Sequence, residues 1–456
     1  MSLDCFFNPK TVAVIGASRD SKKPGHVIFR NFLEGEFKGK VFPVNPNAKE
    51  ILGQKCYKKT TDIKEKIDLA VIVVPAPIVP KILEDCGKKK IKGAIIISGG
   101  FKEVGNVDLE NRVKDIAKKY KMRIIGTNCI GIFDPHSGVD TIFNPSYKLG
   151  RPGEGEIAFI SQSGAVMSVI MDWMGAKGYK ASKFVSYGNA TDVDESDLIE
   201  YIGKDKKTRV ICVYLEGVKD GRKFYNTAKK VSRKKPIIVI KAGITEEGSR
   251  SVSSHTGSLA GKIEAYRAAF KQSGVIEADD IEQVFDYARI LAKQPLPKGK
   301  RTQIITDGGG FGVLATDFVI KNGLEMAKMK KENLDKMKKI FPKHIVVGNP
   351  IDLTGDATPE MYKIAIDAAI KDDNVDMIIV IALFQTPQLT PEVTEVIIEA
   401  SRNKKKPMVV ISAGGEFTEV LKKTLEDNGV PCFSYPDRAV LALKALYKYA
   451  MKRNLV

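Results

Sequence analysis

The sequence is punctuated by short runs of β-branched and other apolar residues, each of which ends in a turn of Gly, Pro, Ser or Asn. Strands buried on both faces of a parallel sheet read as continuous Val- and Ile-rich runs, whereas strands with one solvated face alternate. Helical stretches separate the runs. This pattern predicts the α/β class, with doubly wound parallel sheets whose ligands bind beyond the carboxyl ends of the strands.

The runs fall into three groups, and each group predicts one α/β domain. The first group extends from TVAVIGAS to RIIGTNCIG and predicts a domain over residues 1–130. A loop rich in Pro and Gly leads to the second group, which predicts a domain over residues 145–293. The proline-bearing linker 294–300 precedes a third domain over residues 300–456. No fixed short period indicates a solenoid.

The net charge of +18 arises in part from lysine clusters that precede the runs. The clusters occupy positions where helices end, and cations there offset the negative end of the helix dipole. We therefore expect solvated helix ends rather than a nucleic-acid surface, although a basic surface also favours anionic ligands. The clusters lie at residues 88–90, 118–119, 234–235 and 404–406.

The sequence shows neither an apolar segment of membrane-spanning length nor an export signal, which predicts a protein without membrane association. Its six cysteines lie far apart and form no Cys-x-x-Cys pair. We therefore expect no disulfide framework and no zinc site. A reducing cytoplasm is the expected location.

The first run ends in Gly16-Ala17-Ser18, where backbone N–H groups at a helix start can bind phosphate. A dinucleotide dehydrogenase carries a three-glycine fingerprint here and an acidic residue after its second strand. This chain has neither, because Asn45 and Pro46 follow the second run, so NAD binding is disfavoured. A bare strand-to-helix turn is the alternative for Gly16 alone. Further turn residues end the neighbouring runs: Val74, Pro75, Ala76, Pro77, Ser98, Gly99, Gly100, Asn128 and Cys129.

His255 lies in a stretch of small polar residues, 248–261, between a strand and a helix that begins near Lys262. A core histidine would have apolar neighbours, so the alternatives are an exposed loop histidine without function and an active one. An imidazole that attacks phosphorus presents one nitrogen while the other donates its proton, usually to a carboxylate. Glu216 ends the run VICVYLEG and would face the crevice there. A solvated charge at a strand end is the alternative for Glu216.

The turn Ser161-Gln162-Ser163-Gly164-Ala165 follows a strand and opens a helix. Its N–H groups and hydroxyls can hold phosphate without a full positive charge. A plain serine N-cap is the alternative, and capping is compatible with phosphate binding.

Two turns of the third domain have no assigned role. The glycine-rich turn 307–313 suits a second phosphate cradle, a close subunit contact or a tight turn equally well. The turn 348–356 carries Asp352 and Asp356, but no further ligands are spaced around them. We expect a solvated loop there rather than a metal site.

In these motifs the chain resembles the α subunit of succinyl-CoA synthetase and its ADP-forming acetyl-CoA synthetase relatives. The resemblance covers essentially the whole chain and implies a Rossmann-like CoA-binding domain followed by two flavodoxin-like domains of the succinyl-CoA-ligase type. It implies that His255 carries a phosphoryl group and that Glu216 holds this histidine. It also implies that the helix start at 161–165 faces the phosphohistidine. For CoA, it places Gly16, Ala17 and Ser18 near the phosphates, Asn45, Pro46, Val74, Pro75 and Ala76 around the nucleotide, and Ser98, Gly99, Asn128 and Cys129 near the pantetheine and thiol.

The resemblance also implies a reaction. Phosphate attacks an acyl-CoA to give an acyl phosphate and CoA, and His255 then passes the phosphoryl group to ADP, so that ATP and the free acid result. An ATP-grasp fold that binds ADP or ATP with Mg²⁺ is expected on a separate β subunit, in an α2β2 assembly.

Two alternatives accompany this interpretation. A succinyl-CoA synthetase α subunit is disfavoured by the third domain. A non-catalytic CoA or acyl-CoA sensing module is disfavoured by the presence of both His255 and Glu216. The preferred acyl group, the physiological direction and the choice between ADP and GDP stay open.

Overall fold

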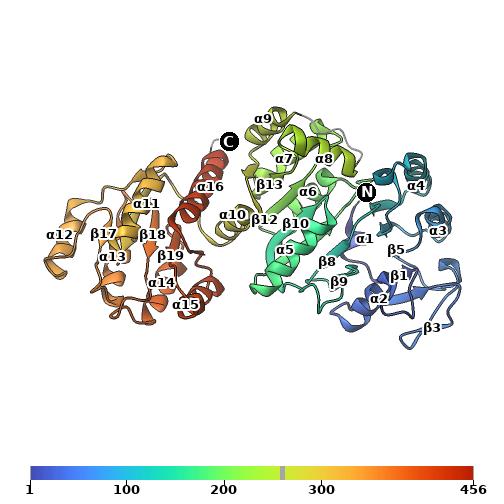
Figure 1. The fold of residues 1–456 in the computed structure, drawn as a ribbon, viewed down its shortest axis with the longest axis horizontal. Helices are drawn as coiled ribbons and strands as arrows, with labels where there is room; N and C mark the ends of the chain where they lie inside the picture. The colour runs from blue at the N-terminus through green and yellow to red at the C-terminus, as the bar shows by residue number, and fades with distance from the viewer. Residues whose placement is uncertain (1, 257–261, 455–456) are drawn as a thin grey trace. The chain divides into compact units, whose positions relative to one another are not determined.

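The computed structural model describes residues 2–256 and 262–454, with side chains for residues 2–252 and 262–453. The chain forms two compact units, Met1–Asp279 and Asp280–Val456. The first unit contains two large sheets and the second contains one (Figure 1). Every apolar run that predicted a strand forms one, which confirms the α/β class. Among the described residues, none of the helices meets the length and hydropathy that a membrane-spanning segment needs.

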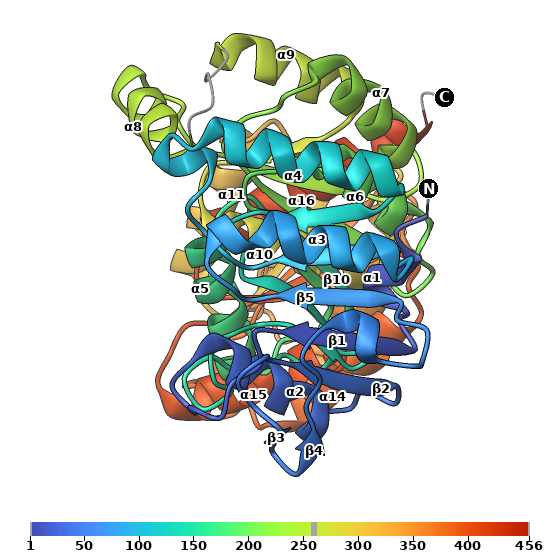
Figure 2. The same ribbon diagram turned by 90° about the vertical axis from the view of Figure 1, so that its right-hand side faces the viewer.

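The first sheet is entirely parallel and has the strand order β2-β1-β5-β6-β7. The order reverses at β1, because β2 pairs with one side of β1 and β5 with the other. Such a reversal opens a crevice at the carboxyl ends of the two central strands. Figure 2 shows α3 and α4 side by side over this sheet. The elements are α1 (Asp4–Phe7), β1 (Thr11–Ile15), α2 (Pro24–Glu34), β2 (Lys40–Val44), β3 (Glu50–Ile51), β4 (Gln54–Lys55), η1 (Thr60–Asp62), β5 (Leu69–Ile72), η2 (Ala76–Ile78), α3 (Val79–Lys88), β6 (Gly93–Ile96), η3 (Lys102–Val104), α4 (Val107–Tyr120) and β7 (Arg123–Gly126).

The second sheet has the order β14-β13-β12-β10-β11-β8-β9, with the antiparallel strands β8 and β9 at one edge. Here the order reverses at β10, between β11 and β12, so a second crevice opens at the carboxyl ends of β10 and β12. The elements are β8 (Gly131–Asp134), β9 (Val139–Asp140), β10 (Glu154–Ser161), α5 (Gly164–Ala176), β11 (Ala181–Ser186), α6 (Glu195–Lys204), β12 (Val210–Leu215), α7 (Gly221–Ser232), β13 (Ile237–Lys241), α8 (Glu246–Thr256), α9 (Ile263–Ser273) and β14 (Ile276–Ala278).

The second unit repeats this plan. Its sheet has the order β16-β15-β18-β19-β20, with β17 also paired to β15, and the order reverses between β15 and β18. The helix α10, which falls within the range 145–293 predicted for the second domain, belongs to this unit. The elements are α10 (Ile281–Lys293), β15 (Arg301–Thr306), α11 (Gly309–Lys321), β16 (Glu325–Met326), α12 (Lys331–Ile340), β17 (Ile351–Asp352), α13 (Pro359–Lys371), β18 (Met377–Ile381), α14 (Glu392–Arg402), β19 (Met408–Ile411), α15 (Glu416–Asp427), β20 (Cys432–Phe433) and α16 (Pro436–Asn454).

The stretch 248–261, expected to be a loop, is partly helical. Its backbone as far as Thr256 belongs to α8, and residues 257–261 lie outside the described part of the chain. Glu246 and Glu247 occupy the first turn, where acidic side chains favour the positive end of a helix dipole. The Thr245 hydroxyl oxygen accepts a hydrogen bond from the Gly248 N–H at 3.0 Å. These contacts explain why small polar residues of modest helix propensity still form a helix here.

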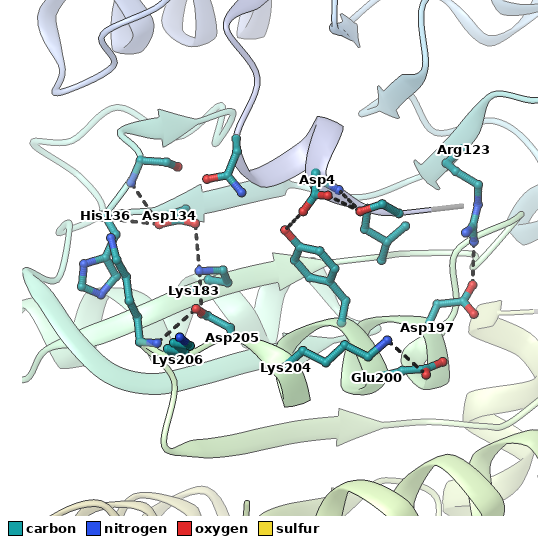
Figure 3. A pocket seen from close by; sticks show the side chains of 16 residues that line it. Asp4, Arg123, Asp134, His136, Lys183, Asp197, Glu200, Lys204, Asp205 and Lys206 are labelled. Carbon is teal, nitrogen blue, oxygen red and sulfur yellow. Dashed lines mark hydrogen bonds and ion pairs between the residues drawn. The ribbon is translucent and has the colours of Figure 1, made fainter.

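A cavity of about 820 Å³ opens in the first unit, on the side opposite the crevices. Its lining includes Arg123, the first residue of β7, and Lys206 and Lys207, which precede β12, so the cavity lies at the amino ends of these strands. At its wall the buried Lys183 ammonium binds two carboxylates, Asp134 at 3.1 Å and Asp205 at 2.9 Å (Figure 3). Burial alone would raise the pKa of Asp205, but the hydrogen bond and charge of Lys183 lower it below the usual range.

We expect Lys183→Met to lower the melting temperature strongly at neutral pH. The substitution leaves two carboxylates facing each other without their cation, which costs about 3 kcal/mol or more for a buried pair. Because the folded-state pKa of Asp205 is lowered, this stabilisation is present above the unfolded-state pKa and is lost as the pH falls. The difference in melting temperature between variant and wild type should therefore shrink below about pH 4.

The matched control is Lys204→Met, which removes an exposed ammonium that lies 3.3 Å from Glu200. An exposed pair of this kind contributes about 0–1 kcal/mol. Scanning calorimetry of the two variants from pH 3 to pH 8 measures the contrast. Equal melting temperatures for both variants would show that the Lys183 pairs contribute nothing.

Candidate functional site

The turn after β1 lies at the reversal point of the first sheet and leaves no room for a side chain at Gly16. Gly16 has a φ of +93°, and a Cβ atom there would lie 2.2 Å from the carbonyl oxygen of Val73, which follows β5. Asn45, after β2, donates from Nδ2 to the carbonyl oxygen of Ala17 at 2.7 Å. Ser98, after β6, donates its hydroxyl hydrogen to the carbonyl oxygen of Val74, which follows β5. Predicted residues from four strands therefore lie together at one edge.

These predicted residues differ in what they present to a ligand. The side chains of Ala17, Ala76 and Cys129 are buried. The Cys129 thiol donates to the carbonyl oxygen of Ile96 at 3.4 Å, and burial raises its pKa to about 12. A ligand would therefore meet mainly the others, which are exposed or half-buried: Gly16, Ser18, Asn45, Pro46, Val74, Pro75, Ser98, Gly99 and Asn128.

At the reversal point of the second sheet, side-chain hydrogen bonds fix the backbone that carries Glu216. The Gln162 Oε1 atom accepts from the N–H groups of Glu216 and Gly217, the latter at 2.9 Å, and Nε2 donates to the Gly217 carbonyl oxygen at 3.0 Å. The Lys241 ammonium donates to the Glu216 carbonyl oxygen at 2.8 Å. Glu216 is buried. Gln162, predicted as a phosphate ligand, thus uses its side-chain amide to hold the Glu216 backbone.

The turn before α5 combines helix capping with an open helix start. Ser163 is the N-cap, and its hydroxyl oxygen accepts from the Val166 N–H at 3.3 Å. Ser161 donates to the Ser163 carbonyl oxygen at 2.7 Å. Gly164 and Ala165 occupy the first turn of α5, where backbone N–H groups lack partners within the helix and can bind an anion. The capping alternative and the phosphate hypothesis are therefore both compatible with this geometry.

The His255 side chain, expected to meet Glu216, lies outside the described residues. The backbone of His255 belongs to the last turn of α8. This helix lies beside η3, the 3₁₀ turn that follows the rim residues Ser98 and Gly99 of the first sheet (Figure 2). The histidine-bearing segment thus approaches the edge at which the two crevices of the first unit open.

The glycine-rich turn of the second unit repeats the turn before α5 in its hydrogen bonds. Thr306 donates its hydroxyl hydrogen to the Gly308 carbonyl oxygen at 2.9 Å, as Ser161 does to Ser163. The Asp307 carboxylate accepts from the N–H of Leu383, which follows β18, at 3.0 Å. Burial raises the pKa of Asp307. In the later turn, Asp352 and Asp356 belong to no potential metal cluster among the described residues.

Three polar residues that the motifs did not reveal lie between the two crevices of the first unit: Glu103, Asn189 and Lys219. Two of them had a weak signal. Asn189 ends the run KFVSYGN, and Lys219 follows Glu216 by three positions. Glu103 lies in η3 and had no signal in the sequence, because its partner Asn189 is 86 residues away in the chain.

Three family models match consecutive parts of the chain. They are a CoA-binding domain over residues 10–135, a succinyl-CoA-ligase-like flavodoxin domain over residues 154–291, and a ligase-CoA domain over residues 302–456. These matches confirm the predicted succession of a CoA-binding domain and two succinyl-CoA-ligase-type domains.

Relatives of known name extend over nearly the whole chain. The chain is 44% identical over 463 residues to the α subunit of acetate–CoA ligase (ADP-forming) I of Pyrococcus furiosus, covering 99% of this chain and 98% of the relative. It is 44% identical over 449 residues to acetate–CoA ligase (ADP-forming) of Methanocaldococcus jannaschii, covering 98% of this chain. The chain spans 63% of the length of that longer relative and 64% of a similar one from Archaeoglobus fulgidus.

A solved structure agrees with these relatives. The dinucleotide-forming acetyl-coenzyme A synthetase 1 of Candidatus Korarchaeum cryptofilum, in complex with phosphate and ADP, superimposes with a TM-score of 0.93 at 41% identity, covering 99% of this chain and 98% of that one. With this identity over nearly its full length, the chain belongs to the family of ADP-forming acetate–CoA ligases, in which it corresponds to the α subunit.

Proposed function

We propose that this chain binds CoA and carries the phosphoryl group in an ADP-forming acyl-CoA synthetase. The observation that carries the proposal is the pair of crevices in the first unit, one edged by Gly16 and the other by Glu216 and the start of α5. A thioester bound at the first and a phosphate bound at the second meet at a common edge.

The reaction proceeds in three displacements. A phosphate oxygen attacks the acyl carbon, the C–S bond breaks, and CoA leaves as the thiol with a proton from phosphate. An imidazole nitrogen of His255 then attacks phosphorus, the bond between phosphorus and the acyl oxygen breaks, and the carboxylate leaves. Finally a terminal oxygen of ADP attacks phosphorus, the P–N bond breaks, and neutral His255 and ATP result.

The residues of the first crevice fit CoA. The absence of a Cβ atom at Gly16 lets the exits of β1 and β5 approach each other closely, and Ser18, Asn45 and Ser98 offer polar atoms at this edge for the CoA phosphates. The proposed contacts of Ala17, Ala76 and Cys129 run through their backbone, since their side chains are buried.

At the second crevice, Glu216 has the role of the acceptor for the imidazole N–H. Its carboxylate keeps the other nitrogen free for attack and stabilises the charge of the phosphorylated ring. The N–H groups of Gly164 and Ala165 stabilise the phosphoryl oxygens without a mobile counterion.

We further propose that the nucleotide, with Mg²⁺ to neutralise its phosphates, binds mainly to an ATP-grasp β subunit in an α2β2 assembly. The name "subunit alpha" of the Pyrococcus furiosus relatives supports a partner chain. The complex of the Candidatus Korarchaeum cryptofilum enzyme with phosphate and ADP supports phosphate and ADP as ligands of the proposed assembly. A cytoplasmic location fits the buried or half-buried free cysteines.

The test is phosphoenzyme formation. The chain and its β partner are incubated with acetyl-CoA and radiolabelled phosphate, and the protein is examined for a label that is stable in base and lost in acid. A label that maps to His255 supports the proposal. Absence of label with several acyl-CoAs, despite measurable CoA binding, would favour a sensing module.

We expect Glu216→Gln to slow phosphohistidine formation roughly 10²- to 10³-fold while leaving CoA affinity unchanged. The amide keeps the shape of the carboxylate but supplies no negative charge to the phosphorylated ring. Quench-flow labelling with phosphate measures the rate. The control is Glu200→Gln, which changes a half-exposed carboxylate of α6. Unchanged labelling in Glu216→Gln would mean that Glu216 is a bystander.

A further inference from the structure

The loop after β11 joins the two sheets of the first unit at their carboxyl edges. Asn189 in this loop is buried, with 8% of its surface exposed. Its backbone N–H donates to the Thr127 carbonyl oxygen at 2.9 Å, and the Thr191 N–H donates to the Gly126 carbonyl oxygen at 2.9 Å. The loop is therefore bonded to the segment that leads from β7 to the predicted CoA residue Asn128.

The Asn189 side chain extends this link to the rim of the first sheet. Its Nδ2 atom lies 2.6 Å from Glu103 Oε2 and 2.8 Å from Glu110 Oε2, so each N–H can donate to one carboxylate. The other Glu103 oxygen accepts from the N–H groups of Gly100 and Phe101. Although burial raises the pKa of Glu103, these hydrogen bonds lower it below its usual range. A charged Glu103 thus fixes the turn that contains Ser98 and Gly99.

On its other side, the same loop is bonded to the loop that carries Glu216. The Lys219 ammonium donates to the carbonyl oxygens of Asn189 at 3.0 Å and Ala190 at 2.6 Å. Lys219 follows Glu216 by three residues, and Gln162 holds the backbone between them. Hydrogen bonds therefore run without a break from the 98–101 turn through Glu103, Asn189 and Lys219 to the Glu216 loop.

We propose that Asn189 is a positioning residue, which acts with Glu103 and Lys219 to set the distance between the thioester carbon and the attacking phosphate. This inference rests on the proposed function, because the first crevice must hold the thioester and the second the phosphate. Reacting atoms must approach to about 3–3.5 Å, and a misplacement of about 1 Å costs roughly 10²-fold in rate. Asn189 contacts Glu103, which fixes the rim of the first crevice, and Lys219, which belongs to the loop of the second.

The chemistry of the position requires an amide. Two carboxylates face Asn189, and a neutral side chain with two N–H donors satisfies both without adding charge. An aspartate would place a third carboxylate against them, and an alanine would leave the buried Glu110 oxygen and the half-buried Glu103 oxygen without this donor.

The test separates the two half-reactions that yield phosphohistidine. One starts from acyl-CoA and phosphate and needs both crevices, whereas the other starts from ATP with the β partner and needs only the second. We expect Asn189→Ala to slow the first roughly 30- to 100-fold and to leave the second, and the affinity for CoA in calorimetry, within about threefold of wild type. The Michaelis constant for acyl-CoA should change little, because binding is intact.

Lys219→Met is the second variant, in case Asn189→Ala fails to fold, and the same split is expected from it. Lys219→Arg should restore most of the rate, since a cation with N–H donors returns. The control is Lys229→Met, which removes an exposed lysine of α7 that interacts with Tyr225.

The outcomes distinguish this inference from the proposed function. An equal fall in both half-reactions and in CoA affinity would show that Asn189 serves the fold alone and would overturn the inference. Unchanged rates in both variants would also overturn it. Absence of phosphohistidine in the wild type from either direction would overturn the proposed function itself, and the inference with it.

Discussion

His255→Ala is expected to reduce overall turnover by roughly 10⁴-fold or more, the order seen when an enzyme loses its nucleophile. The imidazole is the only group that the proposed mechanism gives for carrying the phosphoryl group between the acyl phosphate and ADP. CoA affinity should stay within about twofold, because the proposed CoA site is the crevice of the first sheet. Two measurements check this expectation: ATP formation by the complex with the proposed β partner, and calorimetric titration with CoA.

The control for this experiment is His344→Ala. His344 lies in the second unit, 53% of its side chain is exposed, and its Nε2 lies 3.2 Å from an Asp356 carboxylate oxygen. Full activity in His344→Ala together with its loss in His255→Ala would assign the effect to one imidazole. Full turnover in His255→Ala would exclude a phosphohistidine at this position.

Gly16→Ala is expected to produce the opposite pattern, with CoA affinity reduced roughly 100-fold and ATP-driven labelling of His255 retained. An added Cβ would lie 2.2 Å from the carbonyl oxygen and 2.8 Å from the carbonyl carbon of Val73, and backbone atoms cannot rotate out of the way. Relief requires the exits of β1 and β5 to separate. Overpacking and the strain of a left-handed backbone at a non-glycine residue together cost about 3 kcal/mol at this turn. A free-energy cost of this size corresponds to a roughly 100-fold loss of CoA affinity.

The matched control is Gly221→Ala at the start of α7, where an added Cβ meets nothing within 4 Å. Calorimetry with CoA and labelling with ATP are measured on both variants, and circular dichroism verifies that each is folded. Wild-type CoA affinity in Gly16→Ala would place the CoA phosphates elsewhere. Loss of ATP-driven labelling in a folded Gly16→Ala would show that the two crevices are not separable.

The strands were predictable because burial on both faces leaves a local signature, and runs such as Val210–Leu215 carry it in consecutive residues. Glu216 could be singled out for the same reason, since a strand end is a local feature. The role of Gln162 in holding the Glu216 backbone could not be predicted, because its partners lie 54 and 55 residues away. Its hydrogen bonds also run to backbone groups rather than to a recognisable side chain.

The helix α8 illustrates the opposite difficulty. Small polar residues suggested a loop in the stretch from Gly248, but helix formation depends on contacts of the first turn that composition does not report. Asn189 likewise depends on Glu103 in η3 and Glu110 in α4, which are distant from it in the chain. Sequence patterns thus located the edges of the sheets, and the fold decided which side chains meet there.

The turns before α5 and α11 make equivalent hydrogen bonds but differ in the side chain that follows the neighbouring strand. In the two sheets Ser161 pairs with Tyr214 and Thr306 with Ile381, so Glu216 and Leu383 occupy the same place two residues further on. Gln162 and Asp307 each bind the N–H group of that residue. The same turn architecture thus presents a carboxylate in the first unit and an aliphatic side chain in the second. Leucine has no atom that accepts an imidazole N–H, so the role proposed for Glu216 is open only to the turn of the first unit.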